Sequence, residues 1–81
     1  MNENTENVEK AETIGLSEER RPSCRLVGED GNAFAIMGRV RRALIGAGMK
    51  QEAEDYIKHA TSGDYDNLIG VSMLYVNDSD D

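Results

Sequence analysis

Cys24 and His59 are the residues best suited to nucleophilic chemistry, and each is the single residue of its type in this 81-residue chain. A thiol beside an imidazole can form a nucleophile–base pair. Such a pair needs a third group that orients the imidazole, and the sequence supplies none next to either residue. We therefore predict a strand-packing Cys24, an exposed His59 on a short helix, and no enzymatic activity.

The sequence also offers few residues that could bind a metal ion or a phosphate group. A zinc site takes several Cys or His ligands, which this chain lacks. Asp64, Asp66 and Asn67 resemble the start of a calcium loop, but the later glycine and the bidentate glutamate of that loop are missing, so we expect a helix cap. Residues 28–31 match neither GxxxxGK(S/T) nor GxGxxG, and their two acids would repel a phosphate. We expect no metal ion and no cofactor.

The residues best suited to recognise a charged partner are basic. They are Arg39, Arg41, Arg42 and Lys50, which Arg25 could join. A helix that presents arginines can enter a DNA groove or anchor an acidic surface of a partner protein. The simplest alternative is a solvated helix face whose arginines pair with acids of the next helix, such as Glu52 and Asp55.

The distribution of charge favours a protein partner over nucleic acid. The net charge is −7, of which residues 1–23 and residues 78–81 carry −3 each and residues 24–77 carry −1. Acidic ends favour solubility and oppose binding to nucleic acid or to anionic membranes. A lone cysteine indicates a reducing compartment, and no apolar run has the length of a signal peptide or a membrane span. We predict a cytoplasmic protein without membrane association.

A helix predicted over residues 31–48 positions the basic residues. Apolar residues recur there at the i, i+3, i+4 and i+7 spacing of one helix face. They are Ala33, Ile36, Met37, Val40, Ala43, Leu44 and Ala47. Asn32 or Asp30 can cap the start of this helix, and Gly48 suits the left-handed residue after its end. The alternative is a hairpin that pairs residues 26–27 with residues 34–36.

Shorter elements flank this helix. Residues 24–27 are predicted as a strand, residues 50–60 as a second helix and residues 65–73 as a third. The third helix buries one face at helical spacing. The members of this face are Tyr65, Leu68, Ile69, Ser72 and Met73. Residues 74–76 either extend that helix or form a strand that pairs with residues 26–27.

The two acidic ends are predicted to lie outside the folded domain. Residues 1–23 carry only isolated apolar residues and are typical of a disordered arm, which could also fold as a short helix on a partner. Residues 78–81 form an acidic tail. Residues 24–77 then form a single α+β, helix-rich domain with about three short helices and one or two short strands. A core of this size is marginal, so a partner or a homodimer interface would add stability.

Two motifs in the domain resemble those of a known family. GEDGNAF at residues 28–34 and TSGDYD at residues 61–66, with GRVRRAL between them, are similar to motifs of small bacterial and phage proteins that have no established chemistry. The similarity covers residues 25–76. It implies a strand, a helix, a turn and a final helix with a strand, in a phage or mobile-element setting. The family often has RWV where this chain has LYV, so the resemblance does not fix the final strand.

These features favour a non-enzymatic protein–protein interaction module, such as an accessory or inhibitor protein of a phage or mobile element. The residues predicted to contact the partner are Arg39, Arg41, Arg42 and Lys50. The alternative is a nucleic-acid-binding accessory that uses the arginine face of the first helix. An affinity that falls steeply with salt would favour nucleic acid, whereas binding that survives high salt would favour a protein partner.

Overall fold

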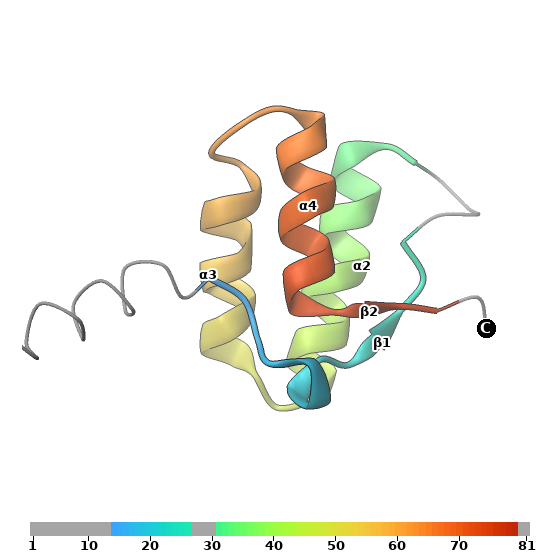
Figure 1. Ribbon diagram of the computed structural model, residues 1–81, viewed down its shortest axis with the longest axis vertical. Helices are drawn as coiled ribbons and strands as arrows, with labels where there is room; N and C mark the ends of the chain where they lie inside the picture. Colours follow the sequence, from blue (N-terminus) through green and yellow to red (C-terminus); the bar gives the residue numbers. More distant parts are fainter. Residues whose placement is uncertain (1–13, 27–30, 80–81) are drawn as a thin grey trace, which may run out of the picture.

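In the computed structural model, which describes residues 14–26 and 31–79, three helices stand side by side and a short two-stranded sheet lies at one end of them (Figure 1). In chain order the elements are η1 (Glu18–Arg20), β1 (Ser23–Cys24), α2 (Ala33–Gly46), α3 (Lys50–Ala60), α4 (Tyr65–Tyr75) and β2 (Asn77–Asp78). This arrangement confirms the predicted helix-rich α+β fold.

Helix α2 forms because its two ends are capped by side-chain and backbone groups. The Asn32 side chain accepts hydrogen bonds from the backbone N–H groups of Phe34 and Ala35, at 2.8 and 3.3 Å. At the other end Gly48 has φ +81°, and Met49 N–H donates to the Leu44 carbonyl at 2.9 Å, which is the Schellman pattern. The helix prediction is thus confirmed, and the alternative hairpin is wrong.

The core lies between the three helices and also takes residues from the strand side. Its innermost members on α2 are Ile36, Val40 and Leu44, and on α3 they are Ala53, Tyr56 and Ala60. The predicted face of α2 is therefore largely buried, although Ala47 at the end of α2 is exposed. Helix α4 instead buries Leu68, Val71, Ser72 and Tyr75.

The predicted inner face of α4 needs correction. Tyr65 and Met73 were expected to be buried, but both are exposed. Helix α4 is apolar around most of its circumference, so the spacing of its apolar residues does not define one inner face. The burial of Val71 and Tyr75 shows that the helix is rotated relative to the predicted setting.

A hydrogen-bonded pair of hydroxyl groups sits inside the core. Ser72 Oγ donates to the Leu68 carbonyl at 2.8 Å and lies 2.7 Å from Tyr56 Oη. Because the single Ser72 hydroxyl proton points to Leu68, Tyr56 is the donor to Ser72. The Tyr56 ring also packs edge-to-face on Tyr75, with ring centroids 5.4 Å apart. Burial raises the pKa of both tyrosines above the usual value.

The two strands are parallel and short. Ser23 pairs with Asn77 and Cys24 with Asp78, and the Asp78 carboxylate accepts from Leu26 N–H at 3.1 Å. The predicted strand at 24–27 is thus correct only at residue 24: β1 begins one residue earlier, residues 25 and 26 are not strand, and residue 27 lies outside the described residues. Of the two alternatives for residues 74–76, the helix extension is confirmed at residues 74 and 75, which belong to α4. The strand begins only at residue 77 and pairs with residues 23–24, so the alternative pairing of residues 74–76 with 26–27 is wrong.

The folded domain begins earlier than residue 24. Leu16, which the sequence places in the disordered arm, is buried, and its N–H donates to the Leu74 carbonyl at 2.8 Å. Arg21 Nε in turn donates to the Leu16 carbonyl at 2.7 Å. Residues 14–23 and 78–79 therefore belong to the domain, while residues 1–13 and 80–81 of the predicted arm and tail lie outside the described residues.

Among the glycines of residues 14–26 and 31–79, Gly15 should be the one whose replacement destabilises the fold most. It has φ +99°, and a Cβ atom there would lie 2.5 Å from the Leu74 carbonyl oxygen. We expect Gly15→Ala to lower the free energy of unfolding by about 1–3 kcal/mol in urea titrations. Gly46→Ala is the matched control, because nothing lies within 4 Å of its Cβ position, and it should be neutral or stabilising. Equal stability of both variants would contradict this packing.

The buried hydroxyl pair predicts a non-additive pair of substitutions. Ser72→Ala leaves the Tyr56 hydroxyl buried without its acceptor, which should cost about 1–3 kcal/mol. Adding Tyr56→Phe removes the stranded hydroxyl, so we expect the double variant to be more stable than Ser72→Ala alone. Chemical denaturation of the wild type, both single variants and the double variant measures this coupling. Strictly additive losses would argue against the hydrogen bond.

Candidate functional site at the helix ends

The two sequence motifs that lie far apart in the chain meet in space. Tyr65 Oη donates to the Gly31 carbonyl at 2.6 Å, although 34 residues separate them. The contact joins the segment before α2 to the first residue of α4. The start of α2, the end of α3 and the start of α4 lie together at the upper end of the bundle in Figure 1. The fold therefore brings residues 31–34 of the first motif and residues 61–66 of the second to one end of the bundle.

A hollow of about 300 Å³ opens between these three helix ends. Its apolar lining consists of Ala33, Phe34, Met37, Ala60, Tyr65 and Leu68. We call it the helix-end pocket. Its lining comes from both motifs, because Ala33 and Phe34 belong to the first and Tyr65 belongs to the second. Its mainly apolar character suits an apolar side chain better than a charged ligand.

Two aromatic side chains at the pocket are exposed. Phe34 is 80% exposed and Tyr65 is 48% exposed. Complete burial of a phenylalanine side chain is worth about 1.5–3 kcal/mol, so a partner that covers Phe34 gains that contribution. No functional role was predicted for Phe34 from the sequence. The signal was present, because Phe34 lies outside the apolar spacing formed by Ala33, Ile36 and Met37.

The polar side chains at the pocket already form hydrogen bonds with backbone groups at the helix ends. The Asp64 carboxylate accepts from Asn67 N–H at 3.0 Å, which confirms the predicted cap. Thr61 Oγ1 donates to the Ile57 carbonyl at 2.8 Å. Among residues 14–26 and 31–79, no group of three or more His, Cys, Asp or Glu side chains is arranged to hold a metal ion. The pocket thus offers an apolar surface with satisfied polar neighbours.

The predicted basic set is divided by the fold. Arg39 Nε and Nη2 donate to the carbonyls of Arg25 and Leu26, each at 2.9 Å, so this side chain ties the segment after β1 to α2. Arg41 instead lies 3.7 Å from Glu54 on α3. Both partners of that ion pair are exposed, and such pairs contribute little to stability.

The expected pairing of the arginines with α3 is therefore partly right. An acid of the next helix does pair with Arg41, but it is Glu54. Glu52 pairs with Arg20 at 3.5 Å, and Asp55 accepts from Gln51 at 3.2 Å.

Arg42 and Lys50 are exposed, as is Arg41. Arg42 lines, together with Arg39, an open hollow of about 440 Å³ beside Ser23 and Cys24. Lys50 is the first residue of α3 and is exposed. Arg39 and Arg42 thus face the strand side while Arg41 reaches toward α3, so the set does not form one continuous basic face.

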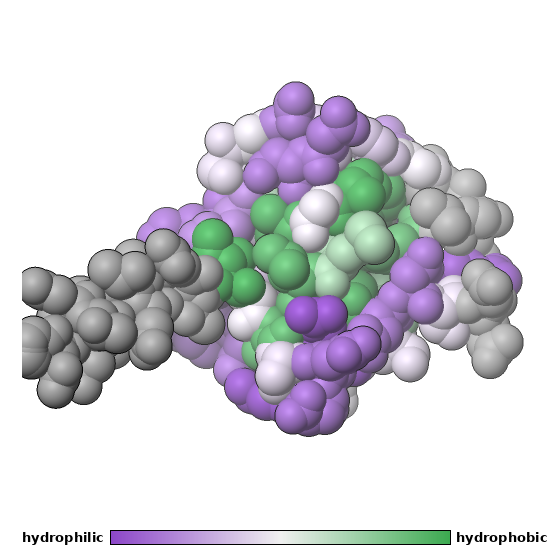
Figure 2. Space-filling model, in the orientation of Figure 1, coloured by the Kyte–Doolittle hydropathy of each residue, from purple (hydrophilic) through white to green (hydrophobic). Residues whose placement is uncertain are grey.

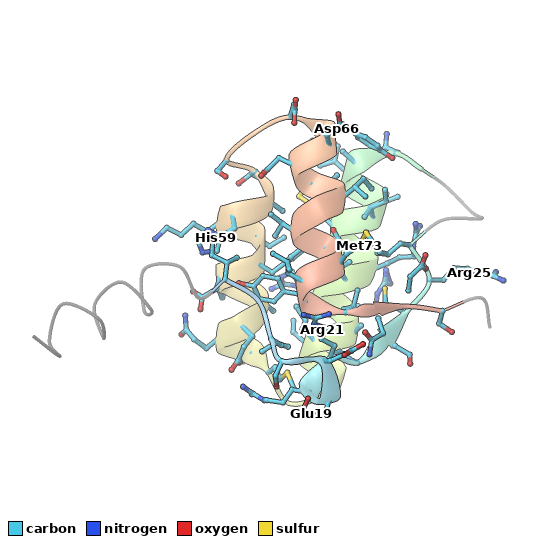
Figure 3. All side chains as sticks on the ribbon, in the orientation of Figure 1. Glu19, Arg21, Arg25, His59, Asp66 and Met73 are labelled. Atoms are coloured by element: carbon cyan, nitrogen blue, oxygen red, sulfur yellow. The ribbon has the colours of Figure 1, made fainter. Side chains whose placement is uncertain are left out.

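Cys24 and His59 are not brought together. Cys24 is buried beside the strand pair, and burial raises the pKa of its thiol even though Arg39 and Arg42 lie near. His59 extends from α3 on the side of the molecule opposite to Arg25, the neighbour of Cys24 (Figure 3). The predicted packing of Cys24 is confirmed, whereas His59 is half-buried rather than exposed.

The outer side of α4 forms a second apolar surface. Met73 and Leu74 are exposed there, Ile69 is half-buried, and Ile14 is exposed next to the same helix. Figure 2 shows this surface as hydrophobic area over α4 with hydrophilic surface above and below it. No helix in the described part of the chain has the length and apolar character needed to cross a membrane.

The burial of Cys24 predicts a slow thiol. We expect its alkylation by iodoacetamide at pH 8 to be at least about tenfold slower in the native protein than in urea, because burial restricts access and raises the thiol pKa. His59→Ala should leave the native rate unchanged. A fast native reaction that His59→Ala slows would instead demonstrate a coupled Cys–His pair.

Comparison of the chain with protein-family models, with curated proteins and with solved structures finds no match. The resemblance of the GEDGNAF and TSGDYD motifs to bacterial and phage proteins therefore stays a prediction.

Proposed function

We propose that the protein is a non-enzymatic protein–protein interaction module that binds its partner at the helix-end pocket. The observation that supports this most directly is the 80% exposure of Phe34 at the edge of an apolar hollow of about 300 Å³. A large aromatic side chain exposed next to an apolar depression is typical of the central contacts of protein interfaces.

The pocket favours a partner that inserts an apolar side chain. The hydrogen bond from Tyr65 to the Gly31 carbonyl fixes one side of the pocket before any partner binds. Phe34 is free to close over an inserted leucine-, methionine- or phenylalanine-like group. The exposed Asp66 in the first turn of α4 adds a negative charge nearby, so a basic residue next to the apolar anchor would be complementary.

The basic residues then have different roles in this proposal. Arg39 serves the fold through its bonds to two backbone carbonyls. Arg41, Arg42 and Lys50 are exposed and would act, if the partner reaches them, as peripheral contacts to acids. Peripheral charges affect the association rate and its salt dependence more than the affinity.

The setting of the protein is proposed on sequence grounds. The motif resemblance supports an accessory or inhibitor protein of a phage or mobile element, and the lone cysteine supports the cytoplasm. Nucleic-acid binding through the arginines is the alternative function. It is less favoured, because Arg39 is engaged within the fold and Arg41 pairs with Glu54.

Photo-crosslinking in host lysate tests the proposed pocket. We expect benzoylphenylalanine at position 34 to crosslink one defined protein after nuclease treatment, and the same group at position 45 to give no such product. Ile45 is a matched position, because it is an exposed apolar residue at the other end of α2.

Phe34→Ala should weaken binding of the identified protein at least about tenfold and change the free energy of unfolding by less than about 0.5 kcal/mol. Ile45→Ala should leave binding of that protein unchanged and should also change the free energy of unfolding by less than about 0.5 kcal/mol. Capture that disappears with nuclease, and that falls steeply with salt, would replace this proposal with the nucleic-acid alternative.

A further inference from the structure

Helix α4 is apolar on the side that faces away from the core. Its inner side carries Leu68, Val71, Ser72 and Tyr75, as described above. Its outer side carries Ile69, Gly70, Met73 and Leu74, and Met73 is 52% exposed. A helix that is apolar on opposite sides normally packs against something on both. We call residues 69, 70, 73 and 74 the outer face of α4.

Gly70 lies in the middle of this outer face and is not needed by the fold. A Cβ atom at Gly70 would meet nothing within 4 Å, so alanine would fit. Glycine in a helix interior costs about 0.5–1 kcal/mol relative to alanine. A missing side chain at the centre of an exposed apolar face lets the axis of a second helix approach closely, which gives this glycine a role.

Opposite charges stand at the two ends of the outer face. Asp66 lies at the start of α4 and Arg21 lies next to its end, with Met73 between them (Figure 3). The hydrogen bonds from Arg21 to Leu16 and from Leu16 to Leu74 hold Arg21 in this place. Neither Asp66 nor Arg21 forms an ion pair with any residue in the described part of the chain.

We propose that the outer face of α4 binds the same face of a second copy of this chain, with the two α4 helices antiparallel and crossing at Gly70. A two-fold axis through this crossing places Asp66 of each copy next to Arg21 of the other, and both charges gain a partner. A parallel arrangement would put Asp66 against Asp66 and Arg21 against Arg21. Charge complementarity therefore selects the antiparallel pair.

This inference goes beyond the partner-binding pocket and does not depend on it. The pocket is built on Phe34 and Tyr65, whereas the dimer is built on Met73 and the charges at the two ends of α4. Phe34→Ala should therefore leave the dimer unchanged, so the two proposals can fail separately.

Sedimentation equilibrium of the full chain tests the dimer directly. We expect a reversible dimer at micromolar concentrations, a monomer for Met73→Glu, and a retained dimer for the control Ile45→Glu, which places the same charge on an exposed apolar site of α2. Circular dichroism verifies that each variant is folded. A wild-type monomer up to about 100 μM, or a dimer that survives Met73→Glu, would overturn the proposal.

A mixing experiment tests the antiparallel register. In a homodimer of Asp66→Arg, the introduced arginine of each copy faces Arg21 of the other copy. In a homodimer of Arg21→Asp, the introduced aspartate of each copy faces Asp66 of the other copy. Each variant should therefore dimerise at least about tenfold more weakly than the wild type. A mixture of the two variants restores an attractive pair at both ends, and we expect a heterodimer of near wild-type affinity. Failure of the mixture to associate would rule out this register.

Discussion

The buried contact between Tyr56 of α3 and Ser72 of α4 determines how the rest of the structure is arranged. Helix α4 is apolar around most of its surface, so hydrophobic burial alone would allow several rotations about its axis. The serine hydroxyl makes one rotation preferable, because it needs both the Leu68 carbonyl and the Tyr56 hydroxyl inside the core. That rotation turns Met73 outward and directs Tyr75 against the Tyr56 ring.

The setting of α4 in turn produces the helix-end pocket. Asn32 caps α2 and Asp64 caps α4 at the same end of the bundle, and their side chains are consumed by backbone N–H groups. The surface between the two caps therefore consists of apolar side chains and of backbone groups that already form hydrogen bonds. A surface of this kind can bind an apolar anchor. The pocket is thus apolar because the capping side chains are occupied, and the exposed Phe34 at its edge is accessible to a partner.

The sequence predicted the elements whose signals are local and redundant. Helix α2 has an amphipathic spacing, an Asn cap and a terminal glycine that all agree, and the bounds of α3 match the predicted residues 50–60. The inner face of α4 was not predictable, because the deciding hydrogen bond joins residues on two helices. Leu16 gave no periodic signal in an acidic segment, since its burial depends on Leu74 far along the chain.

The basic residues and the exposed aromatic residues show the same contrast between what the sequence predicts and what only the fold reveals. Spacing identified Arg39, Arg41 and Arg42 as a group, but only the fold shows that Arg39 is bound to the carbonyls after β1 and that Arg41 reaches Glu54. The exposure of Phe34 could have been predicted from the same spacing of apolar residues that identified α2. It becomes informative only once the end of α3 and the start of α4 are seen beside it.

A small domain gives up stability when it leaves large apolar side chains outside its core. Few residues can be fully buried at this size, so each apolar side chain left in water is a larger share of the available stabilisation. This chain leaves Phe34, Tyr65, Met73 and Leu74 exposed while it fills positions on α3 with Ala53 and Ala60. These four residues fall on two surfaces, the helix-end pocket and the outer face of α4, whereas the exposed Ile45 lies apart from both. Association at the second surface would also cover the helix whose rotation the Tyr56–Ser72 bond controls, so assembly and core stability are coupled through α4.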